Sequence, residues 1–230
     1  MIKAILCDFN GVIIDDESIQ HQAYREIFKP LGIDITDEMY YARLGMDDKS
    51  FVASILDDAK KDYDTDTILD LTSAKTSHWR AIVTQKMPLF SGIDNFLRKM
   101  ARSFTLGIVS MAKREEIDFV LESAGLADLF AVIVSAEFVT KHKPDPECYR
   151  IGFSRIDAVR TATGHLPMTH RECLVIEDTP AGVLAARAAD LPVLAVKNTV
   201  SAEAMRKSGA GAVATYLDDW MAESVSRVFA

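Results

Sequence analysis

The chain has 230 residues, of which 49% are hydrophobic and 26% charged, a balance that excludes intrinsically disordered and fibrous proteins. Its net charge of −8 and the lack of a Lys- or Arg-rich run argue against nucleic acid as a partner. No apolar run approaches the roughly 18 residues of a membrane span, so no membrane partner is expected. The cysteines are widely spaced and resemble buried hydrophobic residues. We therefore expect a cytoplasmic protein and a monomer.

The first predicted element is a buried strand over residues 2–8. This apolar run ends in the carboxylate of Asp8, and Asn10 and Gly11 interrupt it directly afterwards. A short apolar run followed by turn-forming residues is typical of a strand that leads into a tight turn. Asp8 and Asn10 are therefore expected at the end of this strand.

Residues 16–86 differ from the rest of the chain because they show only helical periodicity, with no convincing strand. Two helical faces are indicated by apolar residues three or four positions apart. These faces are formed by Ile19, Ala23, Tyr24, Ile27 and Phe28, and by Phe51, Val52, Ile55 and Leu56. We expect residues 16–86 to form an all-helical cap domain inserted after the first strand.

Strand-like apolar runs recur later in the chain, at 104–110, 130–135, 172–177 and 192–196. Segments of helical period separate these runs, and alternation of this kind indicates parallel β-α units under one sheet. The predicted fold class is therefore α/β, with a Rossmann-like parallel sheet in the core. The core domain would consist of residues 1–15 and 87–230.

Two predicted helix starts mark one edge of this sheet. Asp145 precedes Pro146 and Thr179 precedes Pro180, so each proline would take the first helical position behind a capping side chain. Both starts follow strand-like runs. Polar residues just upstream would then lie at the carboxyl edge of the sheet, where open α/β sheets bind ligands.

A carboxylate, a hydroxyl, an ammonium group and an acidic pair are expected at that edge. They belong to Asp8 with Asn10, Ser110, Lys143, and Glu177 with Asp178. Phosphoryl transfer needs such a set, because fixed positive charge and hydrogen-bond donors must stabilise the phosphate oxygens during nucleophilic attack. Carboxylates also need a cation between them and a phosphate. Mg²⁺ is the expected cofactor because it prefers carboxylate and phosphate oxygens.

Four motifs resemble those of the haloacid dehalogenase-like hydrolase superfamily, in the branch of β-phosphoglucomutase and phosphoglycolate phosphatase. They are Asp8-Phe9-Asn10-Gly11-Val12 with Asp15 and Glu17, then Ser110, then Lys143 with Pro144-Asp145-Pro146, and finally residues 177–182. All four occur in the order of the family and span nearly the whole chain. The helical block at residues 16–86 resembles the family's cap, which closes over the substrate and excludes water.

The resemblance implies a nucleophile and a set of metal ligands. Asp8 would attack phosphorus to form an aspartyl-phosphate, and it would also bind Mg²⁺. The backbone carbonyl of Asn10 and the carboxylate of Asp178 would be further metal ligands. Glu177 would be either a ligand or a supporting partner of one.

The resemblance also implies contacts with the substrate. Ser110 would hold a phosphate oxygen, helped by N–H groups at the start of the following helix. Lys143 would pair with both the nucleophile and the phosphate. Lys75 resembles a cap lysine of this branch, although a lysine on a polar helix face is the simpler alternative.

The cap departs from the mutases of the branch in two positions. Gln20 stands where a family histidine is expected, with His21 adjacent. Asp48 stands where the mutases carry an arginine that grips a phosphate. Asp48 would repel a second phosphate unless Lys49 takes over, and we count His21 and Lys49 among the candidate substrate contacts.

Position 10 departs as well, since the family phosphatases carry there an aspartate that acts as general acid and base. Asn10 cannot exchange a proton near neutral pH, and losing such a group typically costs roughly 10² to 10⁴ in rate. Three explanations stand: an introduced inactivating change, a natural variant that uses another acid, or a non-catalytic binding protein. We favour the natural variant, because Asp15, Asp16, Glu17 and His21 are nearby protonatable groups. The sequence alone then predicts that Asn10→Asp raises hydrolysis of ordinary phosphate monoesters.

Together these patterns predict a phosphatase that acts on a small phosphorylated metabolite and uses Mg²⁺. The alternative enzyme is a β-phosphoglucomutase-like phosphomutase. The alternative of another class is a protein that binds a phosphorylated metabolite without turnover. Release of phosphate, isomerisation and saturable binding would separate the three.

Overall fold

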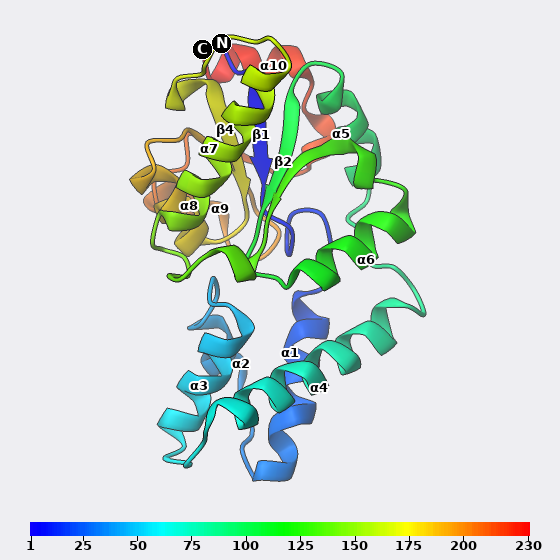
Figure 1. Ribbon diagram of the computed structural model, residues 1–230, viewed down its shortest axis with the longest axis vertical. Coiled ribbons are helices and arrows are strands. Elements are labelled where there is room, and N and C mark those ends of the chain that lie inside the picture. The colour runs from blue at the N-terminus through cyan, green and yellow to red at the C-terminus, as the bar shows by residue number, and fades with distance from the viewer.

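The computed structural model describes residues 1–230 and has two parts, a sheet with helices on both faces and a group of four helices beside it. In Figure 1 the sheet forms the upper part, and the helices α1–α4 lie together below it. The two ends of the chain lie next to each other at the far end of the sheet from α1–α4. None of the helices has both the length and the apolar character that a membrane crossing requires.

Six parallel strands form the sheet, in the order β3-β2-β1-β4-β5-β6. The strands are β1 Ala4–Cys7, β2 Thr105–Val109, β3 Phe130–Val134, β4 Cys173–Glu177, β5 Val193–Val196 and β6 Ala212–Ala214. The chain order reverses at β1, which pairs with β2 on one side and β4 on the other. In open α/β sheets, ligands bind at such a reversal, outside the carboxyl ends of the strands.

Ten helices complete the fold. They are α1 Glu17–Phe28, α2 Asp37–Tyr41, α3 Asp48–Asp58, α4 Thr65–Val83, α5 Ile93–Ala101, α6 Arg114–Ala124, α7 Glu147–Ala162, α8 Pro180–Ala188, α9 Ala202–Lys207 and α10 Ala222–Val228. Short 3-10 helices cover Lys29–Leu31, Ala127–Leu129, Ala136–Phe138, His170–Glu172 and Leu217–Asp219. The helices α1–α4 form the cap, and the other six belong to the part built on the sheet.

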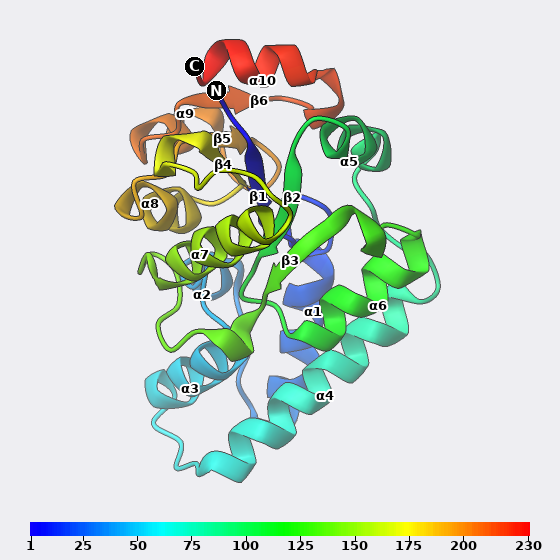
Figure 2. The ribbon, with the colours of Figure 1, turned by 45° about the horizontal axis from the view of Figure 1, so that its top comes forward.

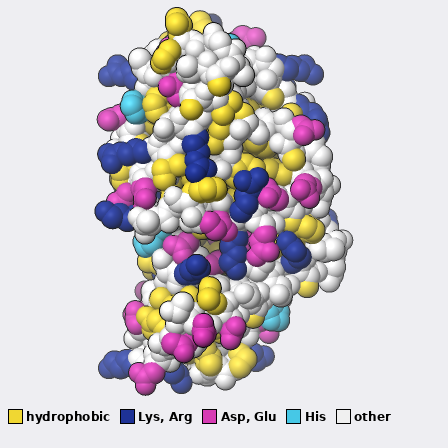
Figure 3. All heavy atoms as spheres, viewed as in Figure 1, with side chains coloured by type: hydrophobic (Ala, Val, Ile, Leu, Met, Phe, Trp, Pro, Cys, Tyr) yellow, Lys and Arg dark blue, Asp and Glu magenta, His cyan; other side chains and the backbone are white.

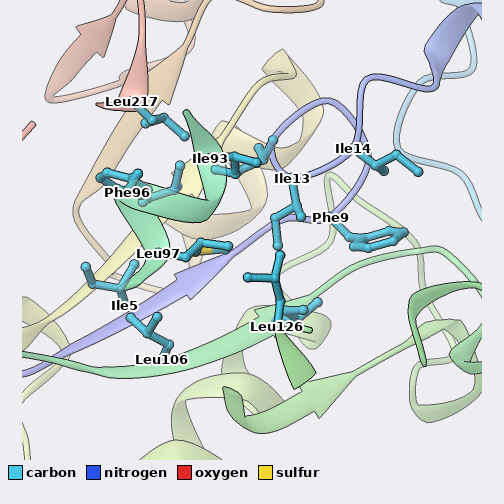
Figure 4. Close-up of a cluster of buried hydrophobic side chains, with 14 of the residues drawn as sticks. Ile5, Phe9, Ile13, Ile14, Ile93, Phe96, Leu97, Leu106, Leu126 and Leu217 are labelled. Carbon is cyan, nitrogen blue, oxygen red and sulfur yellow. The ribbon is translucent and has the colours of Figure 1, made fainter. Parts of the chain in front are cut away.

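The strands are apolar throughout because helices cover both faces of the sheet. Ile5 of β1 belongs to a buried cluster with residues of α5, α6 and α10, whereas Leu6 belongs to a second cluster with residues of α7, α8 and α9. Figure 2 shows these helices on either side of the sheet. In Figure 4, Ile5 and Leu106 of neighbouring strands lie beside Leu97 of α5. Consecutive residues of one strand thus point into different cores.

The cap has a smaller hydrophobic core of its own. The rings of Tyr24 in α1 and Phe51 in α3 stack with their centroids 3.9 Å apart. The start of α3 is fixed by Asp47, whose Oδ1 accepts a hydrogen bond from the backbone N–H of Ser50 at 3.0 Å. The apolar face that the sequence predicts for α3 is fully buried, as is that of α1 except for the partly buried Ile19.

The predicted α/β class, the parallel sheet and the strands β1–β5 are confirmed. The sequence does not predict β6, because Ala212-Val213-Ala214 is too short to give a pattern. The start of α8 is confirmed, with Thr179 accepting from the N–H of Gly182 at 3.1 Å. The start of α7 lies one residue later than predicted. Asp145 accepts from the N–H of Glu147 at 3.0 Å, so Pro146 is the capping residue and not the first helical one.

Gly152 of α7 gives a test of how closely this helix packs on the sheet. A Cβ at this position would lie 2.5 Å from Val109 Cγ2 and 3.1 Å from Leu6 Cδ1, and both neighbours are fully buried. We expect Gly152→Ala to lower the free energy of unfolding in urea by about 1–3 kcal/mol. Ser154→Ala, at an exposed position of the same helix, should change it by less than about 0.5 kcal/mol. Equal effects of the two substitutions would contradict close packing at Gly152.

Candidate active site

Asp8 follows β1 directly and lies where the strand order reverses. Its backbone N–H donates to the carbonyl of Ile176 in β4 at 2.9 Å, and its Oδ1 accepts from the N–H of Phe9 at 2.8 Å. Its Oδ2 lies 2.9 Å from Lys143 Nζ. Burial raises the pKa of Asp8 to about 7, against the opposing effect of Lys143. Asp8 is therefore a fixed, buried carboxyl group at the carboxyl edge of the sheet.

Lys143 connects the loop before α7 to the ends of two strands. Its Nζ lies 2.6 Å from Glu177 Oε1 and 2.9 Å from Asp8 Oδ2. Burial lowers the pKa of this ammonium group, but the two carboxylates outweigh burial and raise it overall. Lys143 thus stays protonated and neutralises charge at the end of both β1 and β4.

Glu177 uses both of its carboxylate oxygens within the protein. Oε1 accepts from the hydroxyl of Tyr149 at 2.9 Å in addition to Lys143. Oε2 accepts from the N–H groups of Asp178 and Thr179 at 2.9 and 3.0 Å and from the Thr179 hydroxyl at 3.1 Å. Burial raises the pKa of Glu177, but Lys143 and these hydrogen bonds lower it overall. This saturation fits a residue that supports Lys143 better than a metal ligand.

Asp178, by contrast, has one carboxylate oxygen without a hydrogen-bond partner. Its Oδ2 accepts from the hydroxyl of Thr199, while its Oδ1 is buried without any hydrogen-bond partner. Burial and the charges of Glu177 and Asp8 raise the pKa of Asp178 well above its usual range. The loop above it contains Gly11 at φ +72°, where a Cβ would lie 1.8 Å from Asp178 Oδ2. A side chain at position 11 would therefore displace this carboxylate.

The acidic cluster fits a hard divalent cation. Asp8, Glu177 and Asp178 each offer an oxygen within 4.8 Å of the others. A buried carboxylate oxygen without a partner is costly unless something else binds it. A cation such as Mg²⁺ would satisfy Asp178 Oδ1 and offset the excess of negative charge.

A cavity lies between the sheet and the cap, directly above these groups. From the part built on the sheet it is lined by Asp8, Asn10, Ser110, Met111, Ala112, Glu116, Lys143 and Thr179. From the cap it is lined by Glu17, Gln20, Tyr24, Tyr40, Arg43, Leu44, Gly45, Met46, Asp48, Phe51 and Lys75. Side chains at the carboxyl edge of the sheet, the floor, and side chains of the cap, the roof, thus face one cavity.

The model of the haloacid dehalogenase-like hydrolase family matches residues 5–196, a range that contains every residue of the acidic cluster and the whole cap. The chain belongs to this family. Haloacid dehalogenase-like enzymes of this branch are phosphoester hydrolases or mutases, and the chain is an enzyme of that class.

Relatives in sequence support the same assignment, and a solved structure shows the same fold. The chain is 26% identical over 212 residues to validoxylamine A 7'-phosphate phosphatase of Streptomyces hygroscopicus subsp. limoneus, with 90% of this chain and 92% of that protein covered. It is 27% identical over 216 residues to SUPPRESSOR OF QUENCHING 1 of Arabidopsis thaliana, covering 90% of this chain but 19% of that protein. The crystal structure of β-phosphoglucomutase from Clostridium difficile has the same fold, with a TM-score of 0.85 at 22% identity and coverage of 100% and 97%.

The structure brings together most of the residues that the haloacid dehalogenase-like motifs single out. Asp8, Asn10, Ser110 and Lys143 line the cavity, as does Lys75 from the cap. Glu177 and Asp178 lie beneath these residues, in contact with Lys143 and with the Gly11 loop. The aromatic residues of the roof are Tyr24, Tyr40 and Phe51. From the sequence, Tyr24 and Phe51 are predicted only as members of two helical apolar faces, and Tyr40 is not singled out.

Two predicted substrate contacts lie elsewhere. His21 does not line the cavity, because its Nε2 contacts the carbonyl of Ile35 at 3.1 Å and its ring stacks on Tyr40. Lys49 is exposed on the surface of α3 and does not line the cavity either. Adjacent residues of a helix point in different directions, and here the neighbouring residues Gln20 and Asp48 face the cavity instead.

The cations that do line the roof are already paired. Lys75 is fully buried, with Nζ 3.0 Å from Asp48 and 3.3 Å from Glu116. Arg43 forms an ion pair with Asp58, and it also bonds to a hydroxyl and a carbonyl of the cap. Neither side chain is free for a second anionic group of a ligand. On the face shown in Figure 3, acidic and basic side chains are likewise interspersed over the middle of the molecule.

Mg²⁺ binding tests the different roles of the two neighbouring acids. We expect Asp178→Asn to weaken Mg²⁺ binding more than about 100-fold, and Glu177→Gln by about tenfold, because loss of a supporting partner has the smaller effect. Isothermal titration calorimetry with Mg²⁺ would measure both. Asp128→Asn, at an exposed position, is the control. A loss in Glu177→Gln equal to that in Asp178→Asn would identify Glu177 as a ligand.

Proposed function

We propose that this chain is an Mg²⁺-dependent phosphatase that hydrolyses a small phosphorylated metabolite through an aspartyl-phosphate on Asp8. One observation carries the proposal: Asp8 lines the cavity, is paired with the ammonium group of Lys143, and has a carboxylate oxygen of Asp178 within 4.8 Å. A nucleophile, a fixed positive charge and a metal ligand are thus available to a single phosphate. Validoxylamine A 7'-phosphate phosphatase, a relative over nearly its full length, is named for this kind of reaction.

Hydrolysis would proceed in two displacements at phosphorus. A carboxylate oxygen of Asp8 attacks phosphorus, the bond to the leaving oxygen breaks, and that oxygen takes up a proton. Water then attacks the aspartyl-phosphate, loses a proton, and releases phosphate and the free carboxylate. Lys143 and the hydroxyl of Ser110 offset charge on the phosphate oxygens in both steps. Asp8, Asp178 and the backbone carbonyl of Asn10 would hold Mg²⁺, which supplies further stabilisation of that charge.

Glu17 is the candidate for the proton transfers that Asn10 cannot perform. It lines the cavity, and its Oε2 accepts from the hydroxyl of Tyr40 at 2.7 Å. Burial, helped by the charge of Asp16, raises the pKa of Glu17 to about 7, which suits acid-base catalysis near neutral pH. Of the other nearby groups, Asp15 is exposed and His21 lies outside the cavity.

The cap favours hydrolysis over a mutase reaction. A phosphomutase must hold a second phosphate away from the nucleophile, and the cations of the roof are paired with Asp48, Glu116 and Asp58. We propose that residues 16–86 act as a cap that encloses the non-phosphate part of the substrate.

A panel of phosphorylated sugars, polyols, acids and nucleotides, each with and without Mg²⁺, tests the proposal. We expect Mg²⁺-dependent release of phosphate from at least one compound and no isomerisation. Asp8→Asn should reduce turnover to background, because an amide is a poor nucleophile. Asp15→Asn, the same change at an exposed position, should retain full activity. Isomerisation, or saturable binding without release of phosphate by the parent, would refute the proposal.

Glu17→Gln tests the assignment of the acid. The amide can still accept from Tyr40 but cannot give a proton, so turnover of an alkyl phosphate should fall by roughly 10² or more. Formation of the phosphoenzyme from an aryl phosphate, followed as the burst of aryl alcohol, should be much less affected, because that leaving group needs no proton. Exposed Glu26 of α1 provides the control substitution Glu26→Gln. Equal losses in the rate of phosphoenzyme formation from the alkyl and the aryl substrate would exclude Glu17 as the acid.

A further inference from the structure

Asp16 is a buried carboxylate that the proposed mechanism does not use. Its two oxygens accept hydrogen bonds from Asn10 Nδ2 at 3.0 and 2.9 Å. Oδ2 also accepts from Gln20 Nε2 at 2.8 Å and from Trp79 Nε1 at 2.7 Å. Every partner is an N–H donor, so the arrangement requires an acceptor at position 16 and donors around it.

These partners come from separate parts of the fold. Asn10 belongs to the loop after β1, whereas Gln20 lies in α1 and Trp79 in α4, the helices by which the chain enters and leaves the cap. Figure 1 shows α1 and α4 side by side below the sheet. Asp16 therefore ties residue 10 of the active site to both helices that connect the cap with the rest of the fold.

The anchored amides leave their oxygen atoms for other partners. Asn10 Oδ1 lies 3.5 Å from Ser110 Oγ, the hydroxyl proposed to hold a phosphate oxygen. Gln20 lines the cavity, and its buried Oε1 has no hydrogen-bond partner. Because Asp16 takes the N–H groups, it determines which way both amides point. The unpartnered oxygen of Gln20 suits a hydroxyl or amine donor on the substrate.

A carboxylate at position 10 would not fit beside Asp16. Its oxygen would replace Asn10 Nδ2 at about hydrogen-bond distance from the Asp16 oxygens, and two like charges would then meet in a buried site. By the same reasoning, an aspartate at position 10 would need a hydrogen-bond donor at position 16. In this chain the donor is at position 10 and the acceptor at position 16.

We propose that Asn10 and Asp16 are a matched pair, in which Asp16 is the positioning residue that orients the amides of Asn10 and Gln20 and couples them to the cap. The proposal rests on the phosphatase function for its kinetic readout only. It replaces the expectation from sequence that Asn10→Asp alone raises hydrolysis. Asn10 is suited to its surroundings, and restoring an acid at position 10 requires a change at position 16 as well.

A double-mutant cycle of Asn10→Asp and Asp16→Asn tests the pair. Turnover of para-nitrophenyl phosphate and of the best alkyl phosphate would be measured, together with the melting temperature of each protein. We expect each single substitution to lower turnover by about tenfold or more, and the double substitution to regain at least about tenfold over Asn10→Asp. The melting temperature should likewise fall in Asn10→Asp and recover in the double variant. Asp15→Asn is the matched control and should leave both quantities unchanged.

Each outcome decides the proposal. If Asn10→Asp does not fold but the double variant does, the pairing is supported by folding alone. If the two substitutions have independent, multiplicative effects, or if Asn10→Asp by itself raises turnover, Asp16 is not the partner that position 10 requires. If no protein turns over any phosphate, the phosphatase function fails, and the cycle of melting temperatures still tests the pair.

Discussion

A single buried ammonium group holds the candidate active site together. Lys143 lies between Asp8 and Glu177, which end the neighbouring strands β1 and β4, so the pairing of the strands and the neutralisation of charge depend on each other. Without this cation, the buried carboxylates at the reversal of strand order would be unmatched, and breaking such a buried pair typically costs about 3–5 kcal/mol. The hydrogen bonds to both oxygens of Glu177 fix this carboxylate in place. Glu177 in turn holds Lys143 next to Asp8.

The sheet side and the cap side of the cavity differ in their chemical groups. The floor has the charged groups that can act on a phosphate, whereas the cations of the roof are already neutralised by carboxylates. The roof instead offers the rings of Tyr24, Tyr40 and Phe51 and the amide of Gln20. Under the proposed function, these rings and this amide would recognise the non-phosphate part of the substrate by packing and hydrogen bonds, while the charged groups below act on the phosphate. A change of substrate would then require substitutions in the cap, while the groups on the sheet stay the same.

Much of this arrangement follows from the sequence, because residues at the ends of parallel strands must meet at one edge. Asp8, Ser110, Lys143 and Asp178 were predictable in this way, each from the apolar run before it. The cap residues were not, since which side of a helix faces the cavity depends on how the cap sits on the sheet. For the same reason the sequence favoured His21 and Lys49 as substrate contacts, whereas their neighbours Gln20 and Asp48 line the cavity. One of the three hydrogen-bond partners of Asp16, Trp79, is distant along the chain, and no local sequence pattern joins the two.

The position of the chain ends has a practical consequence. Both ends lie together at the side of the sheet away from the cap, as Figures 1 and 2 show. A surface tether, an affinity tag or a fused domain at either end would leave from this side, away from the helices α1–α4. Either end of the chain can thus be used for attachment from the same side of the molecule. A bead or sensor surface attached there would be at the end of the molecule away from the cap.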